Sequence, residues 1–526
     1  MTRATIEQGT LQGFEHAGVH GFKGIPYAAP ISGENRWRPP QPPEHWSDVR
    51  DATQAGVVCQ QPILKLPTWL FGRAAGLLDP LINPAKTLPM GDDCLNLNVW
   101  TPAPDPEAKL PVMFWIHGGG STQGSGSMPM YDGAALAKKG VVVVNINYRL
   151  GLAGFLSAPD YFDGDFGTPN RGYLDMIAAL RWVQQNISQF GGDPDQVTIF
   201  GESAGGVAIS VLLASPASKG LFHRAIMMSG VPESGASLGQ HQALAGELFE
   251  KVGIKRGDAE ALSRVPPEKL VEWCGTFDQL GRRSPEKYGG LSRGLGSAPN
   301  TLETEFQPVP ILDAIASGQA SHVDLMLGTT RDETRLFSFI MPGPVRLASR
   351  LFLKAFGSCT GPNMSAKDFI REYRRLMPEA SRHLIREQVT TDALFRRGTV
   401  RAAEAHAQTN PGRTFLYQFE WPSPAMNGAM GAMHGLELPL VFQTMDDHPE
   451  LYGDVEAARG ISEQMSDAWV NFAKNGTPSA SGLPRWEAFE SEKRASMVLN
   501  TRSEILYDTD REKVKIWGER QPGAVV

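Results

Sequence analysis

The sequence has few of the features that mark metal-dependent, nucleic-acid-binding or membrane-spanning proteins. Its 526 residues include four cysteines and no CxxC pair, which argues against a zinc site or a thioredoxin-like motif. No run of Lys or Arg stands out and the net charge is -7, so a nucleic-acid footprint is not expected. No apolar run reaches the roughly 20 residues that span a bilayer. We therefore expect no metal, no other cofactor, no nucleic-acid partner and no membrane contact.

The chain also lacks an apolar segment near its N-terminus of the kind found in secretory signal peptides. This favours a cytoplasmic location, and a mature secreted form is the alternative. Scattered cysteines in a cytoplasmic protein are most often reduced core residues. There is no internal repeat and no evident linker, although a prior of about 150 residues per domain would suggest several domains.

The centre of the chain alternates between expected strands and helices. Residues 111–116 and 140–146 are apolar, β-branched or aromatic runs typical of buried strands, and apolar residues at helical spacing predict a helix over 172–187. Further strands are expected at residues 197–200, 225–228, 323–327 and 414–419. This alternation predicts an α/β fold whose mostly parallel sheet is flanked by helices. Such a sheet carries its active site at the carboxyl ends of its strands.

A G-x-S-x-G motif places Ser203 directly after the strand expected at 197–200, and residues 204–213 read as a helix. This strand–turn–helix context predicts a nucleophile elbow, in which a tight turn lifts the serine hydroxyl above the sheet. Gly201 and Gly205 suit a turn with no room for side chains. A chance match in an ordinary turn is the alternative, and the flanking strand and helix argue against it.

A second motif, His-Gly-Gly-Gly at residues 117–120, follows the strand expected at 111–116. Loops of this type supply backbone N–H donors to the oxyanion that forms during acyl transfer, and their glycines let the backbone approach the substrate. The alternative is a flexible glycine-rich turn, since residues 121–126 continue in the same style. The two motifs together favour a serine hydrolase.

Motifs along nearly the whole chain resemble the type-B carboxylesterase and cholinesterase family. They are FKGIPYA at 22–28, DDCLNLNV at 92–99, NYRLG at 147–151, FGGDP at 190–194, residues 197–206, MHG at 433–435 and WVNFA at 469–473. The sequence is most similar to bacterial para-nitrobenzyl-esterase-like members. The resemblance implies one α/β-hydrolase domain over residues 1–526, with long insertions that form an active-site gorge.

The resemblance also implies a catalytic triad of Ser203, Glu333 and His434. Glu333 follows an expected strand, and His434 lies in the Met-His-Gly segment, so the three residues occur in the order Ser, acid, His. Asp332 is the alternative acid, and Thr334 stands where the family usually has glycine. In this arrangement the histidine takes and returns the serine proton while the acid orients the imidazole.

The resemblance assigns the oxyanion hole to the backbone N–H groups of Gly119, Gly120 and Ala204. Ser229 matches a family serine that supports the triad, and Glu202 is expected to tune the field beside the nucleophile. Structural polar roles are equally open for these last two residues.

Several departures from cholinesterases predict a preference for uncharged esters. Residues 81–86 contain no aromatic ring that could hold a quaternary ammonium by cation–π contact. Ser121 stands where a bulky aromatic is expected, and Ala236 replaces an acyl-pocket aromatic. The function predicted is a serine carboxylesterase acting on a small-molecule ester. An adhesion or scaffold relative, or an amidase, lactonase or thioesterase with the same triad, is the alternative, and monomer and homo-oligomer are both open.

The family closes a loop with a disulfide at the positions of Cys59 and Cys94. The loop spans 35 proline-rich residues, and its closure would stabilise the fold by roughly 3–4 kcal/mol on the chain-entropy model. We expect the two sulfurs within bonding geometry and leave their redox state open. Cys274 and Cys359 match no family pair and are expected to be free.

Overall fold

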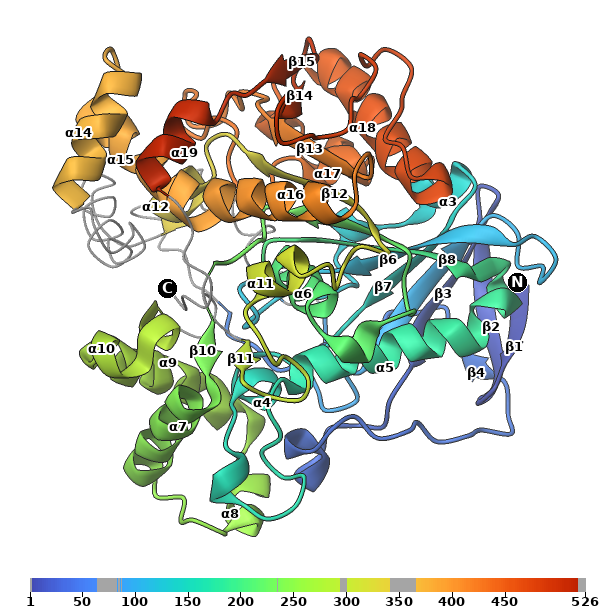
Figure 1. Cartoon of the computed structure of the whole chain (residues 1–526). Coiled ribbons are helices and arrows are strands. Elements are labelled where there is room, and N and C mark those ends of the chain that lie inside the picture. Colours follow the sequence, from blue (N-terminus) through green and yellow to red (C-terminus); the bar gives the residue numbers. More distant parts are fainter. Residues whose placement is uncertain are drawn as a thin grey trace.

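The computed structural model describes residues 2–63, 83, 86, 88–233, 235–293, 300–340 and 366–518. These residues form a thirteen-stranded sheet surrounded by helices (Figure 1). The strands are β1 (Thr2–Ile6), β2 (Gly9–His16), β3 (Val19–Pro26), β4 (Arg50–Asp51), β5 (Asn96–Thr101), β6 (Leu110–Ile116), β7 (Val142–Ile146), β8 (Gly192–Glu202), β9 (Arg224–Met228), β12 (Asp324–Thr330), β13 (Thr414–Phe419), β14 (Ala495–Leu499) and β15 (Glu504–Tyr507). A separate two-stranded sheet pairs β10 (Ala236–Ser237) with β11 (Thr301–Leu302).

The large sheet runs in the order β1-β2-β3-β5-β7-β6-β8-β9-β12-β13-β14-β15, with β4 beside β2. Its centre, from β7 to β14, is parallel, and the pairs toward its two edges are antiparallel except for the short β4, which is parallel to β2. The mostly parallel sheet predicted from the sequence is therefore confirmed. The strands of one sheet extend from near the start to near the end of the chain, which is consistent with the one-domain organisation over 1–526, and that organisation stays a prediction.

Helices connect the strands and cover both faces of the sheet. Their bounds are α3 (Ala134–Lys138), α4 (Gly151–Phe155), α5 (Arg171–Asn186), α6 (Ala204–Leu213), α7 (Leu238–Val252), α8 (Ala259–Ser263), α9 (Pro267–Arg283), α10 (Pro285–Tyr288), α11 (Ile311–Ala316), α12 (Thr334–Ile340), α14 (Ala366–Leu376), α15 (Arg382–Thr391), α16 (Arg397–Thr409), α17 (Leu438–Val441), α18 (Val455–Asn475) and α19 (Arg511–Trp517). A π-helical turn, Asp392–Arg396, joins α15 to α16. Among the described residues, no helix combines the length and the apolar character needed to cross a membrane.

Two hydrophobic cores lie on the two faces of the sheet because side chains alternate along each strand. In β6, Val112, Phe114 and Ile116 pack into the core that contains α5 and α6. Met113 and Trp115 of the same strand pack into the opposite core with α18. Figure 1 shows α5 running along one side of the sheet and α18 on the other. Burial on both faces explains why the central strands are apolar at nearly every position.

Most expected elements agree with the structure to within about three residues at each end, and one strand begins clearly earlier than expected. The helix at 204–213 and the strand at 414–419 have the predicted bounds. The strand expected at 197–200 begins instead at Gly192, because Gly192 pairs with Leu110 across a register shift in the β6–β8 ladder. The segment before residue 197 contains Pro194, which in the sequence indicates a turn. The register shift allows this segment to remain part of β8.

Candidate active site

The predicted site residues lie in four segments that follow strands β6, β8, β12 and β13, and these strands end at the same edge of the sheet. The glycine run follows β6 and Ser203 follows β8, and these strands are neighbours with Ile116 beside Gly201. Glu333 follows β12 and His434 follows β13, which is the next strand in the sheet. All four strands are parallel, so their carboxyl ends meet, as the sequence predicts for the location of the site.

Ser203 occupies a sharp turn between β8 and α6. Its φ is 54° and its ψ is -120°, an unusual backbone conformation for a residue with a side chain. A Cβ at Gly201 would lie 2.7 Å from the Ile116 carbonyl oxygen, and one at Gly205 would lie 2.0 Å from the same atom. Both positions therefore require glycine, as expected for a nucleophile elbow. Ser203 is partly exposed while its immediate neighbours are buried, so its side chain is accessible.

His434 and Glu333 form the base–acid pair expected from the sequence. The His434 Nδ1 atom donates to Glu333 Oε2 at 2.6 Å. The other carboxylate oxygen of Glu333 accepts from the Ser229 hydroxyl at 2.6 Å and from the Thr330 N–H at 2.8 Å. These bonds hold a fully buried carboxylate in one orientation and fix the tautomer of the imidazole. Ser229 thus touches the acid directly, as its supporting role requires.

The second nitrogen of His434 faces Glu202, the residue before the nucleophile. His434 Nε2 lies 3.0 Å from Glu202 Oε1, and neither atom has a hydrogen-bond partner with good geometry among the described residues. The structure records no hydrogen bond between His434 and Ser203 in the part of the chain that it describes. The Nε2 atom of His434 is therefore available to accept a proton. Ser203 directly follows Glu202, the residue whose carboxylate lies beside Nε2.

Carboxylates set the protonation of this site. Burial disfavours a charged His434, but Glu202 and Glu333 outweigh burial and raise its pKa to about 9. Burial raises the pKa of Glu202 to about 7, opposed by His434. Glu437 is fully buried, and neither of its carboxylate oxygens has a hydrogen-bond partner among the described residues. Burial together with Glu202 and Glu333 raises its pKa well above the usual value. Raised carboxyl pKa values reduce the negative charge around His434.

Two phenylalanines flank the His434 ring. Phe337 of α12 lies 5.2 Å from it between ring centroids, and Phe395 of the π-helical turn lies 4.9 Å from it. The two phenyl rings are nearly parallel to each other. Sequence reasoning missed Phe337, Phe395 and Glu437 as neighbours of the histidine. Phe395 lies in a π-helical turn, and such turns are often found at functional sites. The turn has no sequence signature, so it could not have indicated Phe395 in advance.

The glycine run folds as an oxyanion loop should. Gly119 and Gly120 have φ of 106° and 59°, and a Cβ on Gly119 would lie 2.0 Å from the Gln123 carbonyl oxygen. The Gly119 carbonyl accepts from the N–H groups of Thr122 and Gln123, which turns the loop back on itself. The N–H groups of Gly119, Gly120 and Ala204 have no acceptor within the described ranges. They are therefore available to a developing oxyanion.

Asp332, the alternative acid, makes no contact with His434 in the described structure. Its carboxylate pairs with Arg331 and Arg335 and accepts from the Ala432 N–H. Thr334, where the family usually has glycine, bonds α12 to α15 through its hydroxyl, which donates to the Glu387 carbonyl at 3.0 Å. The geometry therefore favours Glu333 as the acid.

The structure tests part of what the sequence predicts for the cysteines. Cys59 and Cys94 are buried free thiols, and the Cys59 thiol donates to the Tyr148 carbonyl at 3.0 Å. Burial raises the pKa of Cys59 well above its usual value. The two thiols form no disulfide in the described structure, and bonding geometry between their sulfurs stays a prediction. Cys359 lies outside the described residues.

The positions compared with the choline pocket of cholinesterases are described only in part. Most of residues 81–86 lie outside the described residues. Ala236 is buried in β10, and Ser121 is buried after the glycine run.

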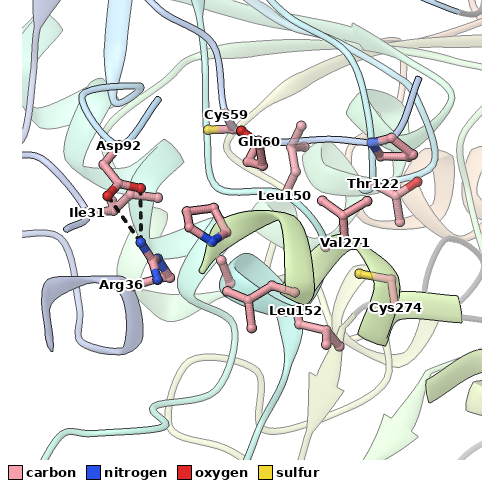
Figure 2. Close-up of a pocket in the computed structure, with 15 residues that line it drawn as sticks. Ile31, Arg36, Cys59, Gln60, Asp92, Thr122, Leu150, Leu152, Val271 and Cys274 are labelled. Atoms are coloured by element: carbon pink, nitrogen blue, oxygen red, sulfur yellow. Dashed lines mark hydrogen bonds and ion pairs between the residues drawn. The ribbon is translucent and has the colours of Figure 1, made fainter. Parts of the chain in front are cut away.

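A separate cavity of about 50 Å³ lies between the residues after Cys59, those that begin α4 and helix α9 (Figure 2). Its walls are mostly apolar, and an ion pair between Arg36 and Asp92 closes one side. Thr122 connects it to the glycine loop, but its lining includes none of the triad residues. The region that the structure describes contains no cluster of three or more residues able to hold a metal ion.

Comparison with known proteins shows similarity to esterases along nearly the whole chain. The model of the carboxylesterase family matches residues 2–517. The chain is 38% identical to the para-nitrobenzyl esterase of Bacillus subtilis over 516 residues, which covers 97% of each protein. It is 34% identical to the fumonisin B1 esterase of Sphingopyxis macrogoltabida, covering 92% of this chain and 84% of that protein. Among solved structures, a thermophilic PNB esterase has a TM-score of 0.82 at 36% identity, covering 98% of this chain and all of that one.

Proposed function

Because the chain belongs to the carboxylesterase family and is a serine carboxylesterase of the α/β-hydrolase fold, we propose that Ser203, His434 and Glu333 carry out its ester hydrolysis. The substrate class proposed is small, uncharged carboxylic esters. The observation that carries the proposal is the His434 Nδ1–Glu333 Oε2 bond of 2.6 Å, at the sheet edge where the Ser203 elbow ends β8.

In the first half of the reaction, His434 Nε2 removes the Ser203 proton as Oγ attacks the ester carbonyl carbon. The N–H groups of Gly119, Gly120 and Ala204 stabilise the oxyanion of the tetrahedral intermediate. The intermediate collapses with cleavage of the bond to the alcohol oxygen, which takes the proton from His434. This leaves an acyl group on Ser203.

In the second half, water attacks the acyl carbon and gives its proton to His434. Collapse of the second intermediate returns the proton to Ser203 and releases the carboxylic acid. Glu333 stabilises the imidazolium in both halves, and Ser229 keeps Glu333 oriented by the 2.6 Å bond from its hydroxyl. Ser229 is thus a positioning residue for the acid.

Charge around His434 supports the preference for uncharged esters. A site that holds a cationic alcohol needs negative charge or an aromatic ring to contact the cation. Here burial raises the pKa of Glu437 well above its usual value, so this carboxyl group carries less negative charge near neutral pH. Amide, lactone and thioester cleavage would use the same triad, and the esterase relatives favour ester substrates.

The test is turnover of short para-nitrophenyl esters by Ser203→Ala. We expect a loss on the order of 10⁴-fold or more with the fold intact, together with organophosphate labelling of Ser203 alone in the wild type. Ser210→Ala is the matched control, because Ser210 lies in the same helix α6 and its hydroxyl donates to the Val207 carbonyl at 2.7 Å. Activity that survives in Ser203→Ala, or labelling of another serine, would refute the proposal.

A further inference from the structure

Asp332 links the segment that carries the acid to the segment that carries the histidine. Its backbone N–H donates to the Ala432 carbonyl at 2.9 Å, and its Oδ2 accepts from the Ala432 N–H at 2.9 Å. Asp332 directly precedes Glu333, and Ala432 lies two residues before His434. A reciprocal pair of hydrogen bonds therefore joins two segments that are far apart in the sequence.

Two arginines hold the Asp332 carboxylate in place. Arg331 Nη2 lies 2.9 Å from Oδ2, and Arg335 Nη2 lies 3.0 Å from Oδ1. The Asp332 side chain is only 9% exposed, so its carboxylate is largely shielded from water, and the pair with Arg335 is better shielded than the pair with the more exposed Arg331. With both oxygens engaged, the carboxylate has one orientation in which it can accept from the Ala432 N–H.

The backbone of the histidine segment packs closely against this carboxylate. A Cβ on Gly431 would lie 2.5 Å from Asp332 Oδ2 and 2.3 Å from Arg335 Nη1, and the φ of Gly431 is 55°. Gly431 is therefore glycine for two reasons, the close approach and the left-handed backbone. Its carbonyl accepts from the Ser423 N–H, which closes a small loop in the same segment.

The histidine segment depends on such contacts for its position. It runs from the end of β13 at Phe419 to the start of α17 at Leu438 without helix or strand. His434 itself has polar contacts with Glu333 and Glu202 in the described structure. The two hydrogen bonds at Ala432 are among the contacts that fix this segment, and they lie two residues before the imidazole.

We propose that Asp332 is a positioning residue that holds His434 in register with Glu333 and Ser203. The proposal rests on the triad roles given above. Catalysis by a histidine base needs its nitrogen within hydrogen-bond reach of the serine hydroxyl, and an error of about 1 Å can cost about 10²-fold in rate. Asp332 acts through the Ala432 backbone and not on the substrate.

The experiment compares Asp332→Ala, Asp332→Asn and the control Asp446→Asn. Asp446 pairs with Arg459 on the surface, where its side chain is 62% exposed. Rates are measured per active site, after titration with a chromogenic organophosphate. We expect Asp332→Ala to lower kcat by about 10- to 100-fold with little change in KM. Asp332→Asn should keep most of the activity, because its amide oxygen still accepts from the Ala432 N–H.

A second variant keeps the proposal testable if Asp332→Ala fails to fold. Gly431→Ala pushes a methyl group against the same carboxylate, so it should also lower kcat per titrated site. A wild-type kcat per titrated site in Asp332→Ala or in Gly431→Ala would overturn the proposal, even if the melting temperature falls. Titration of a serine other than Ser203 would instead refute the triad assignment, so the two failures are distinguishable.

Discussion

The pH dependence of turnover tests how the buried carboxylates act on His434. Glu202 Oε1 lies 3.0 Å from His434 Nε2, and Glu333 Oε2 lies 2.6 Å from Nδ1. Burial alone would lower the pKa of His434, but the two carboxylates outweigh it and raise that pKa to about 9. Because the imidazole accepts the Ser203 proton only when it is neutral, wild-type kcat/KM should increase with pH up to that value.

Glu202→Gln keeps the shape of the side chain and removes its charge. An opposite charge at this range changes a pKa by roughly 1 to 3 units, so the acidic limb of kcat/KM should move to lower pH by that amount. The imidazolium formed during attack also loses a stabilising partner. The plateau rate should therefore fall, by up to about tenfold for each pKa unit lost. A shift to lower pH combined with a lower plateau is the signature of this role.

The assay is kcat/KM for para-nitrophenyl butyrate between pH 5 and pH 10, with Ser203→Ala giving the background hydrolysis at each pH. Glu202 itself has a pKa of about 7, so the wild-type limb belongs to the coupled pair and should be broader than a single titration. Glu463→Gln is the control, because Glu463 contacts Lys139 on the surface. An acidic limb at the same pH in Glu202→Gln and in wild type would refute the reasoning.

Three further predictions concern the triad acid, the substrate preference and a buried ion pair. Glu333→Gln should fold but lose about 10⁴-fold in kcat, since the imidazole loses its orienting partner, and the triad assignment fails if Asp332→Asn is the more damaging change. A kcat/KM for butyrylcholine equal to that for an uncharged butyrate ester would contradict the expected preference for uncharged esters. Arg149→Met should cost about 3–5 kcal/mol in urea unfolding at pH 7, because it leaves the fully buried Asp175 without its partner at 2.6 Å. The exposed Arg459→Met should change stability little, and equal losses in the two variants would contradict this explanation.

The elements around the nucleophile were predictable because their signals are local. Each of these signals comes from a short stretch of sequence. They are the apolar runs before residues 117 and 201, the glycines at 201 and 205, and the helical pattern after Ser203. Steric limits explain the glycines, since a Cβ at Gly205 would lie 2.0 Å from the Ile116 carbonyl oxygen. The extension of β8 back to Gly192 was not predictable, because it depends on pairing with Leu110 in another strand.

The choice between Asp332 and Glu333 shows where local information ends. Both are carboxylates in the same turn, and only the resemblance to a family favoured Glu333 before the structure was known. In the folded chain Glu333 contacts His434 across 101 residues of sequence, and Asp332 contacts Ala432 across 100. The two neighbouring carboxylates therefore contact two different residues, His434 and Ala432, of the same segment.

The sequence by itself predicted the reaction class, the nucleophile and the type of sheet, because a strand, a tight turn and a helix follow from steric rules and side-chain periodicity over short distances. Only the tertiary structure decided which groups surround His434. Phe337, Phe395 and Glu437 become its neighbours through packing of helices and turns that follow different strands. Their effect on the histidine depends on burial and on distances of a few ångströms, and these quantities exist only once the segments after β8, β12 and β13 have come together.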